Sequence, residues 1–411
     1  MLVVGAGLAG ARTVQTLRAE GFEGSIRVLG DEGVLPYDRP PLSKELLTRP
    51  APAWLRDELD LDLAALADEV HLAGPARGLR LRAGGVQVLT EDGAFIAGHV
   101  IVATGAHAVR PPRWEAALTL HTADDARRLR AALAAGGPLV VVGAGWIGAE
   151  VAGVVAAAGI DVTVLEGAPT PLHEALGGLV GALTMPWYAA AGVQLVTDAR
   201  VDVVDGAGVT LTNGRRFPAP TVLAAVGARP STLWLGGVLP VDRSGALRVD
   251  AAYRVLDDDV PVPGLWAVGD VAVRRSARHG WVPGGHWDGA LRGPQALARA
   301  LVRDARPDMS PPEEPVPDPA PYVFSTQLGH DVALFGLPGD GCPVVLRGDP
   351  AAGDGWTALW VSGEVVHAVL VVDRPHDVGA ARRLMSGATL PRVDVAAVAD
   401  PALPLRAARP A

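Results

Sequence analysis

A glycine motif near the start of the chain has the spacing needed to bind a pyrophosphate. Gly5 permits a tight turn, Gly7 lets the backbone approach the phosphates, and Gly10 lets a helix pack closely on a strand. The amides at the start of that helix would then hold the phosphate anion. Asp31, 21 residues beyond Gly10, or its neighbour Glu32 is placed to accept hydrogen bonds from an adenosine ribose.

A second segment repeats this pattern with Gly143, Gly145 and Gly148, and Glu166 follows 18 residues after the last glycine. A carboxylate at this position favours NADH, because it would repel the 2′-phosphate of NADPH. The alternative for Glu166 is a solvated residue at the end of a strand.

Each motif lies in a pattern typical of a βαβ unit. A short apolar strand precedes it, a helical segment follows to about residue 20 or 158, and second strands are expected at residues 25–30 and 161–165. A glycine motif alone also occurs in ordinary turns, so this context carries the interpretation. Two such units imply electron transfer between two dinucleotides, and FAD with NADH fits that pairing.

Shorter segments complete the predicted organisation. Strands are expected at residues 86–90, 99–103, 208–212, 221–226 and 265–270, and the proline-rich residues 307–321 predict a domain boundary. Residues 322–399 alternate short β-like runs and end in a short helix near 378–385. The predicted fold class is α/β, with two nested Rossmann-like FAD and NAD domains plus a small α+β C-terminal domain. We expect an FAD-binding domain at 1–115 and 241–315, an NAD-binding domain at 116–240, and the C-terminal domain at 316–411.

Composition excludes several classes of function. The chain has 411 residues, a net charge of −9 and no long basic run, which argues against a nucleic-acid partner. It has no apolar run of about 18 residues and no basic leader, so we expect no membrane span, no signal peptide and a cytoplasmic location. Cys342 is the only cysteine, which excludes an intrachain disulfide and a cysteine-rich metal or iron–sulfur site. No metal site is expected.

One string is far more specific than the glycine motifs. PYDRPPLSK at residues 36–44, together with both motifs, Ala103-Thr104-Gly105 and the AVGD string at 267–270, resembles the oxygenase-coupled NADH-dependent ferredoxin reductases. These are the putidaredoxin-reductase-like and biphenyl-dioxygenase-reductase-like flavoproteins, and the resemblance covers residues 2 to about 391. It implies a fold similar to that of glutathione reductase, with a C-terminal domain that partly covers the flavin.

The resemblance also implies roles for individual residues. Lys44 would approach the N5 edge of the flavin and Glu150 would pair with it beside the nicotinamide, making these two the catalytic residues. A cation near N5 steadies the negative charge that develops as hydride arrives. Asp270 would bind FAD or cap a helix, and Trp287 would line the flavin or belong to the core. The positions expected to contact FAD or the nicotinamide dinucleotide are Gly5, Gly7, Leu8, Ala9, Gly10, Asp31, Glu32, Arg39, Pro40, Lys44, Ala103, Thr104, Gly105, His121, Gly143, Gly145, Trp146, Ile147, Gly148, Glu150, Glu166, Gly227, Gly269, Asp270, His286, Trp287 and Ala290.

Several positions depart from the family pattern. His121 stands where relatives have an arginine that touches FAD. Three polar residues near the flavin are replaced by Gly285, Gly289 and Gly293, and a C-terminal tryptophan and aspartate are replaced by Phe324 and Thr326.

The leading hypothesis is an NADH:ferredoxin reductase that serves a cytochrome P450 or a Rieske-type oxygenase, as a monomer or homodimer. With no cysteine beside the flavin, electrons must leave it directly, which suits a one-electron acceptor. Ferredoxins are usually acidic, so docking would need a basic patch, for which Arg274, Arg275 and Arg278 are candidates. One alternative is a small-molecule NADH-dependent FAD reductase or oxidase in metabolite biosynthesis, and another is a non-catalytic binding module.

Overall fold

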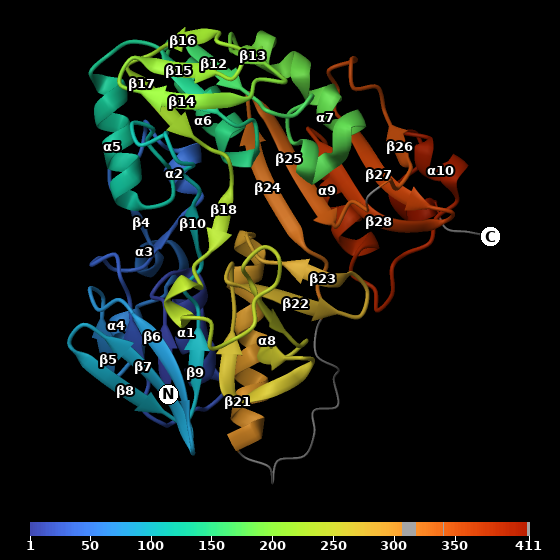
Figure 1. Ribbon diagram of the computed structural model, residues 1–411. Helices are drawn as coiled ribbons and strands as arrows, with labels where there is room; N and C mark the ends of the chain where they lie inside the picture. The colour runs from blue at the N-terminus through green and yellow to red at the C-terminus, as the bar shows by residue number, and fades with distance from the viewer. Residues whose placement is uncertain (306–317, 340, 409–411) are drawn as a thin grey trace. The chain divides into compact units, whose positions relative to one another are not determined.

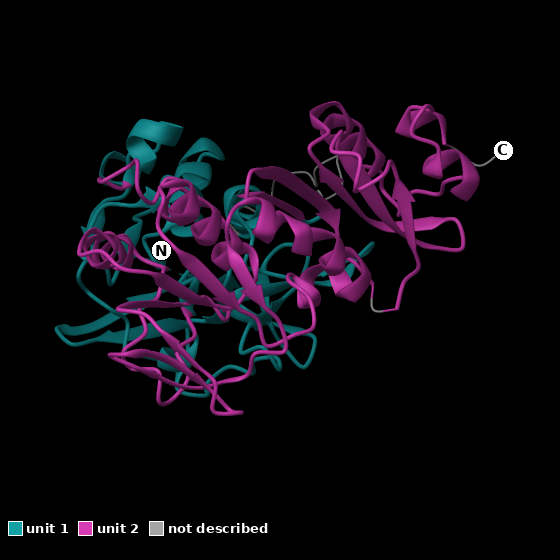
Figure 2. Ribbon diagram, turned by 90° about the horizontal axis from the view of Figure 1, so that it is seen from above, with its two compact units in different colours: residues 1–38, 53–107, 228–321 teal, residues 39–52, 108–227, 322–411 magenta. Residues whose placement is uncertain are grey.

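The computed structural model describes residues 1–305, 318–339 and 341–408. Most of the proline-rich segment predicted as a domain boundary therefore lies outside the described residues. The chain forms two compact units whose segments alternate along the sequence (Figures 1 and 2). Unit 1 comprises residues 1–38, 53–107 and 228–321, and unit 2 comprises residues 39–52, 108–227 and 322–411.

A nine-stranded sheet in the order β23-β22-β19-β20-β21-β9-β1-β2-β5 dominates unit 1. Strand β1 pairs in parallel with β2 and β9, and all three of its residues are buried, as expected for an apolar interior strand in the parallel part of a sheet. The strands are β1 (Leu2–Val4), β2 (Arg27–Leu29), β5 (Glu69–His71), β9 (Val100–Val102), β19 (Leu247–Val249), β20 (Arg254–Asp257), β21 (Val260–Ala267), β22 (Ala272–Ser276) and β23 (Gly280–Pro283).

Two long helices of unit 1 contact each other, α1 (Leu8–Ala19) and α8 (Trp287–Ala305). The hydroxyl of Thr16 in α1 donates to the carbonyl of Pro294 at 3.2 Å, so the helices approach closely there. Smaller elements of the unit are β3 (Tyr37–Asp38), β4 (Ala53–Trp54), α3 (Leu55–Leu59), α4 (Leu63–Leu66), the antiparallel sheet β6 (Gly78–Arg82), β7 (Gly85–Thr90) and β8 (Gly93–Ala97), and a 3₁₀ turn at Leu233–Leu235.

Unit 2 contains a second parallel sheet, in the order β13-β12-β11-β17. Helix α5 precedes this sheet and begins with a capping box, in which Thr122 and Asp125 satisfy each other's backbone amides. The elements are α2 (Pro41–Lys44), α5 (Ala123–Ala134), β11 (Leu139–Val142), α6 (Trp146–Ala157), β12 (Val162–Leu165), α7 (His173–Ala190), β13 (Gln194–Val196), β14 (Val201–Asp205), β15 (Gly208–Leu211), β16 (Arg216–Pro218) and β17 (Thr221–Ala224). Strand β10 (Ala106–Ala108) pairs with β18 (Ala228–Pro230) where the chain passes between the units.

The C-terminal part of unit 2 is a five-stranded antiparallel sheet in the order β24-β25-β28-β27-β26, with α9 against it (Figure 1). Alternate buried side chains of this sheet, such as Leu334, Trp360 and Leu370, belong to the same hydrophobic cluster as those around α6, which explains why both lie in one unit. A Cβ on Gly153 of α6 would lie 2.7 Å from the backbone nitrogen of Leu328, so the contact is close. The elements are β24 (Tyr322–Gln327), β25 (His330–Gly336), β26 (Val344–Arg347), β27 (Trp356–Ser362), β28 (Val365–Val372), α9 (Pro375–Leu384), α10 (Val395–Ala399) and a 3₁₀ turn at Leu405–Ala407.

The strands and the C-terminal helix predicted from sequence are present, with ends shifted by a few residues. The expected strand at 265–270 is the end of the longer β21, which stops at Ala267, before Gly269 and Asp270. The boundaries of the four predicted domain segments stay a prediction.

Candidate functional site

The first glycine motif forms the predicted turn between β1 and α1. Gly5 has φ +117°, and a Cβ there would lie 2.1 Å from the carbonyl oxygen of Ala103. A Cβ on Gly10 would lie 1.9 Å from the carbonyl oxygen of Gly5, so both glycines are required by the chain's own packing. Gly7 differs, because a Cβ there would meet nothing within 4 Å. It leaves open space before a helix start that no side chain caps among the described residues, and a phosphate fits this cradle.

The second motif repeats this geometry between β11 and α6. A Cβ on Gly143 would lie 2.4 Å from the carbonyl oxygen of Ala225, and one on Gly148 would lie 2.1 Å from that of Gly143. Gly145 again faces open space and begins a helix that no described side chain caps. The α6 residues Trp146 and Ile147 follow it directly, and Gly227, with φ +101°, lies beyond the end of β17.

The predicted ribose carboxylates lie at the predicted places. Glu166 follows β12 directly and accepts the N–H of Ala144 at 2.6 Å. Asp31 and Glu32 follow β2 and are exposed, and Glu32 accepts the Tyr37 hydroxyl at 2.5 Å. Their contacts with ribose stay a prediction.

The predicted catalytic pair is in contact. Lys44, at the end of α2, forms an ion pair with Glu150 in α6, whose side chain is only 7% exposed. The hydroxyls of Ser43 and Ser325 also donate to this carboxylate. A buried carboxylate needs such partners, because an unpaired buried charge is costly. The ammonium also lies 5.1 Å from the ring centroid of Phe324.

Arg39 and His121 are also brought together, through the backbone. A guanidinium nitrogen of Arg39 donates to the carbonyl oxygen of His121, and the N–H of His121 donates to Asp125 at 3.0 Å. Pro40 starts the turn that leads into α2. A role of the His121 side chain at FAD stays a prediction.

Unit 1 gathers the other predicted FAD contacts around the starts of α1 and α8. Gly269 approaches Ala9 so closely that a Cβ on it would lie 2.8 Å from that side chain. Asp270 accepts the N–H of Gly285 at 3.0 Å, so the carboxylate holds the loop before α8. The hydroxyl of Thr104 donates to the carbonyl of Ser231 at 2.8 Å, which ties the segment after β9 to the chain after β18.

His286 and Trp287 lie where this loop becomes α8. The indole N–H of Trp287 donates to Asp38 at 2.6 Å. Burial lowers the pKa of His286, although the nearby carboxylates of Asp270 and Asp288 oppose the shift. Ala290 is half-buried and packs against the main core of unit 1.

The three glycines expected to replace polar residues of the family differ in environment. A Cβ on Gly285 or Gly289 would meet nothing within 4 Å, so space is open there. A Cβ on Gly293 would lie 2.6 Å from the hydroxyl oxygen of Tyr253, so this tyrosine occupies the space that a side chain at 293 would need.

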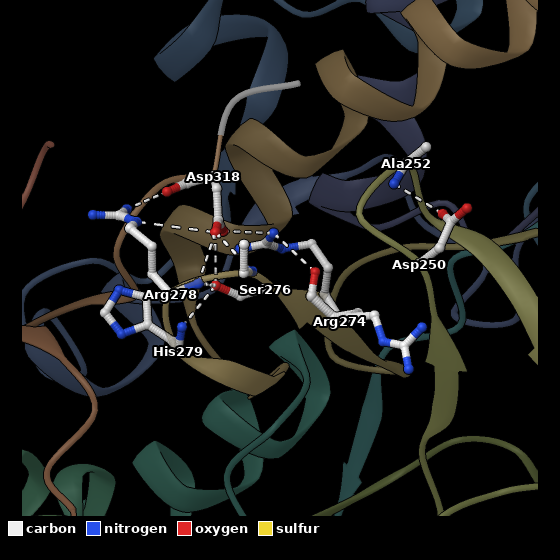
Figure 3. Close-up of polar contacts among 9 residues, drawn as sticks. Asp250, Ala252, Arg274, Ser276, Arg278, His279 and Asp318 are labelled. Atoms are coloured by element: carbon white, nitrogen blue, oxygen red, sulfur yellow. Dashed lines mark hydrogen bonds and ion pairs between the residues drawn. The ribbon is translucent and has the colours of Figure 1, made fainter. Parts of the chain in front are cut away.

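The predicted basic docking patch is wrong for two of its three arginines. Arg274 and Arg278 are buried, with side chains 7% and 3% exposed, and both lie against the Asp318 carboxylate (Figure 3). That carboxylate also accepts the hydroxyl of Ser276 at 2.8 Å. Only Arg275 is exposed, and it pairs with Asp259. Sequence alone could not show this, because the acidic partner lies 40 residues or more along the chain.

Two further residues, Ser325 and Gln327, received no role from the sequence but are linked to Glu150 by hydrogen bonds in the structure. The structure draws attention to them, because the two buried positions of β24 are both polar. Among the described residues there is no group of three or more His, Cys, Asp or Glu side chains that could hold a metal. None of the described helices is long and apolar enough to cross a bilayer. Burial raises the pKa of the Cys342 thiol, which disfavours the reactive thiolate.

Two Rossmann-type glycine turns and a C-terminal α+β domain define a two-dinucleotide oxidoreductase. Residues 1–292 match the family model described as pyridine nucleotide-disulphide oxidoreductase, and residues 322–409 match the one described as reductase C-terminal. The chain belongs to the pyridine nucleotide-disulphide oxidoreductase family, and the predicted resemblance and fold class are confirmed.

Relatives and solved structures agree along nearly the whole length. The ferredoxin–NAD(+) reductase component of the p-cumate 2,3-dioxygenase system of Pseudomonas putida is 30% identical over 419 residues, covering 99% of this chain and 97% of its own. The crystal structure of Fdr9 is similar with a TM-score of 0.87 and 36% identity, covering 100% of this chain and 99% of that one. The covalent putidaredoxin reductase–putidaredoxin complex gives a TM-score of 0.85 at 28% identity, with coverage of 98% and 96%.

Proposed function

We propose that this chain takes hydride from NADH onto bound FAD and passes single electrons to a ferredoxin that serves a cytochrome P450 or a Rieske-type oxygenase. The observation that carries the proposal is the pair of glycine turns, each with one glycine facing open space before a helix start that no described side chain caps. Flavin supplies the chemistry, because it accepts two electrons as hydride and can release them singly.

The cysteine count separates this function from others in the family. The sequence has one cysteine, so a dithiol–disulfide pair within the chain cannot take electrons from the flavin. Cys342 follows the predicted dinucleotide-binding segments and has a raised thiol pKa. The simpler interpretation is that electrons pass directly from the flavin to an external acceptor. The relatives named as ferredoxin reductases support a ferredoxin as that acceptor.

The two units would hold the cofactors through the residues predicted from sequence. In unit 1 the first glycine motif, the segment 103–105 and the loop from Gly269 to Ala290 would contact FAD. Arg39, Pro40, Lys44 and His121, which belong to unit 2, are also expected to contact FAD. In unit 2 the second motif, Glu166 and Gly227 would hold NADH. The Lys44 ammonium, fixed by Glu150, would supply a positive charge beside the flavin ring. Glu166 favours NADH over NADPH through its negative charge. We expect the protein to act in the cytoplasm.

Steady-state NADH oxidation tests this function with three acceptors. The purified yellow protein should reduce ferricyanide, should reduce cytochrome c rapidly only when a ferredoxin is present, and should react slowly with oxygen. Reduction of ferricyanide without any acceleration of cytochrome c reduction by a panel of ferredoxins would reject the ferredoxin assignment.

A small-molecule acceptor is the second candidate. The open space at Gly285 and Gly289, where the family pattern has side chains, favours it. In that case NADH oxidation would be accelerated by a metabolite and by no ferredoxin in the panel.

A further inference from the structure

The Lys44–Glu150 pair is part of a buried network that reaches into the C-terminal sheet. Lys44 and Ser325 both donate to Oε1 of Glu150, and Ser43 donates to Oε2 at 2.5 Å. Behind Ser325, the side-chain amide of Gln327 donates to its hydroxyl oxygen at 3.0 Å. Ser325 is 3% exposed and Gln327 is 1% exposed, so water does not compete for these hydrogen bonds.

Because Ser325 and Lys44 donate to the same oxygen of Glu150, Ser325 restricts where the Lys44 ammonium can lie. A carboxylate oxygen offers two lone-pair directions. With the hydroxyl of Ser325 in one of them, the ammonium of Lys44 is confined to the other. This matters because lysine has a flexible four-carbon stem and would otherwise sample many positions.

Gln327 fixes which way the Ser325 hydroxyl points. A hydroxyl has one hydrogen to donate, and its oxygen can accept others. Because Gln327 donates to that oxygen, the hydrogen is committed to Glu150. The chain of donors runs from Gln327 through Ser325 to the carboxylate and meets Lys44 there.

We propose that Ser325 and Gln327 are positioning residues for flavin reduction, which hold Glu150 so that the Lys44 ammonium keeps one orientation. The inference rests on the proposed function, in which Lys44 and Glu150 act beside the reacting rings. No proton or electron passes through Ser325. The C-terminal domain thereby contributes to the hydride-accepting step through β24.

Single-turnover flavin reduction tests this inference. The FAD-loaded wild-type protein and its Ser325→Ala, Ser325→Thr and Gln327→Met variants are mixed with NADH without oxygen, and flavin bleaching is followed at several NADH concentrations. Thr357→Val is the matched control, because it removes a fully buried hydroxyl of the same C-terminal sheet that has no hydrogen-bond partner among the described residues.

The limiting rate constant should fall about tenfold in Ser325→Ala, because a misplaced charge loses much of its effect on the reaction. The apparent Kd for NADH should stay within about twofold. Gln327→Met should slow reduction by a smaller factor, Ser325→Thr should restore it, and Thr357→Val should behave as wild type. A role limited to general stability would not separate the rate constant from the Kd in this way.

Three results would overturn this inference and leave the proposed function intact. The first is a wild-type rate constant of flavin reduction in Ser325→Ala, and the second is an equal loss of rate in Thr357→Val. The third is a loss of rate that ferricyanide turnover shows to follow from a lower FAD content. If Ser325→Ala does not retain FAD, Gln327→Met carries the test, and a wild-type rate constant there overturns the inference. If NADH does not reduce the flavin of the wild-type protein, the proposed function is rejected, and this inference with it.

Discussion

Glu166 accepts the backbone N–H of Ala144 at 2.6 Å, which ties the end of β12 to the middle of the second glycine motif. Its other oxygen accepts the N–H of Ala168 at 2.7 Å. These two backbone N–H groups orient the carboxylate, and its remaining lone pairs are the acceptors that a ribose diol needs. One side chain therefore holds the second glycine turn and, under the proposed function, would also make the contact that favours NADH.

Replacing Glu166 tests this double role. Glu166→Ala should raise the KM for NADH by about fivefold. It should also reduce the preference for NADH over NADPH, because the charge that repels a 2′-phosphate is gone. The measurement is kcat/KM for both nucleotides with ferricyanide. Asp161→Ala, an exposed carboxylate just before the other end of β12, is the matched control. Unchanged kinetics in Glu166→Ala would reject the role.

Substitutions at Gly7 and Gly145, the two motif glycines that face open space, should distinguish the two cofactor sites. Gly7→Ala meets nothing within 4 Å and has φ −72°, so the apoprotein should fold with unchanged or slightly higher stability. FAD affinity should nevertheless fall by at least about tenfold, because the methyl group would prevent the pyrophosphate from lying close to the backbone. Gly145→Ala should instead raise the KM for NADH and leave the FAD content intact. Flavin absorbance, thermal unfolding of the apoprotein and steady-state kinetics measure the three quantities, and the same pattern in both variants would contradict the assignment of separate sites.

Removing the Lys44 ammonium should affect both rate and stability. Lys44→Met leaves Glu150 buried without its cation, which should cost about 2 kcal/mol of unfolding free energy. Flavin reduction should slow at the same time. The double variant Lys44→Met with Glu150→Gln should regain part of the stability and none of the rate, since the buried charge is removed and the cation is still missing. Stability losses that simply add in the double variant would contradict the coupling.

The Asp318 cluster should stabilise unit 1. Asp318→Ala leaves two buried guanidiniums without their carboxylate and should cost about 3 kcal/mol, measured by denaturant unfolding. Asp259→Ala, which breaks the exposed pair with Arg275, should cost no more than about 0.5 kcal/mol. Equal losses in the two variants would show that burial does not set the strength of these ion pairs.

This cluster also predicts a pH dependence. Burial alone would raise the pKa of Asp318, but hydrogen bonds from Ser276 and Arg274 and the charge of Arg274 outweigh it and hold the pKa below its usual value. A carboxyl whose pKa is lower in the folded state contributes stability that is complete above the unfolded pKa and lost as the pH falls through the folded one. The wild type should therefore lose more stability than Asp318→Ala between about pH 5 and pH 3. Parallel curves would argue against the lowered pKa.

Local signals allowed much of the fold to be predicted. Glycine spacing, apolar strands and the acid after the second strand are short-range features, and the structure places both motifs between strand and helix as expected. The contacts that could not be predicted join residues far apart in sequence. Ser325 reaches Glu150 across 175 positions, and Asp318 reaches Arg274 across 44. Charge alone made Arg274 and Arg278 look like a surface patch, because sequence composition carries no information on a distant acidic partner.

Family resemblance was enough to pair Lys44 with Glu150, but it did not explain the glycine at 293. The structure does, since Tyr253 fills the space that a larger side chain would need there. Gly285 and Gly289 have no such neighbour within 4 Å of an added Cβ, so these two positions leave room for a different acceptor.

Ferredoxin-dependent cytochrome c reduction by the purified, FAD-loaded protein decides whether this chain is a ferredoxin reductase. With NADH as donor, the rate should rise steeply and saturably on adding a ferredoxin, and NADPH should support a much lower rate. A protein that is yellow and reduces ferricyanide, yet gives the same cytochrome c rate with and without every ferredoxin offered, would show that its electrons go elsewhere.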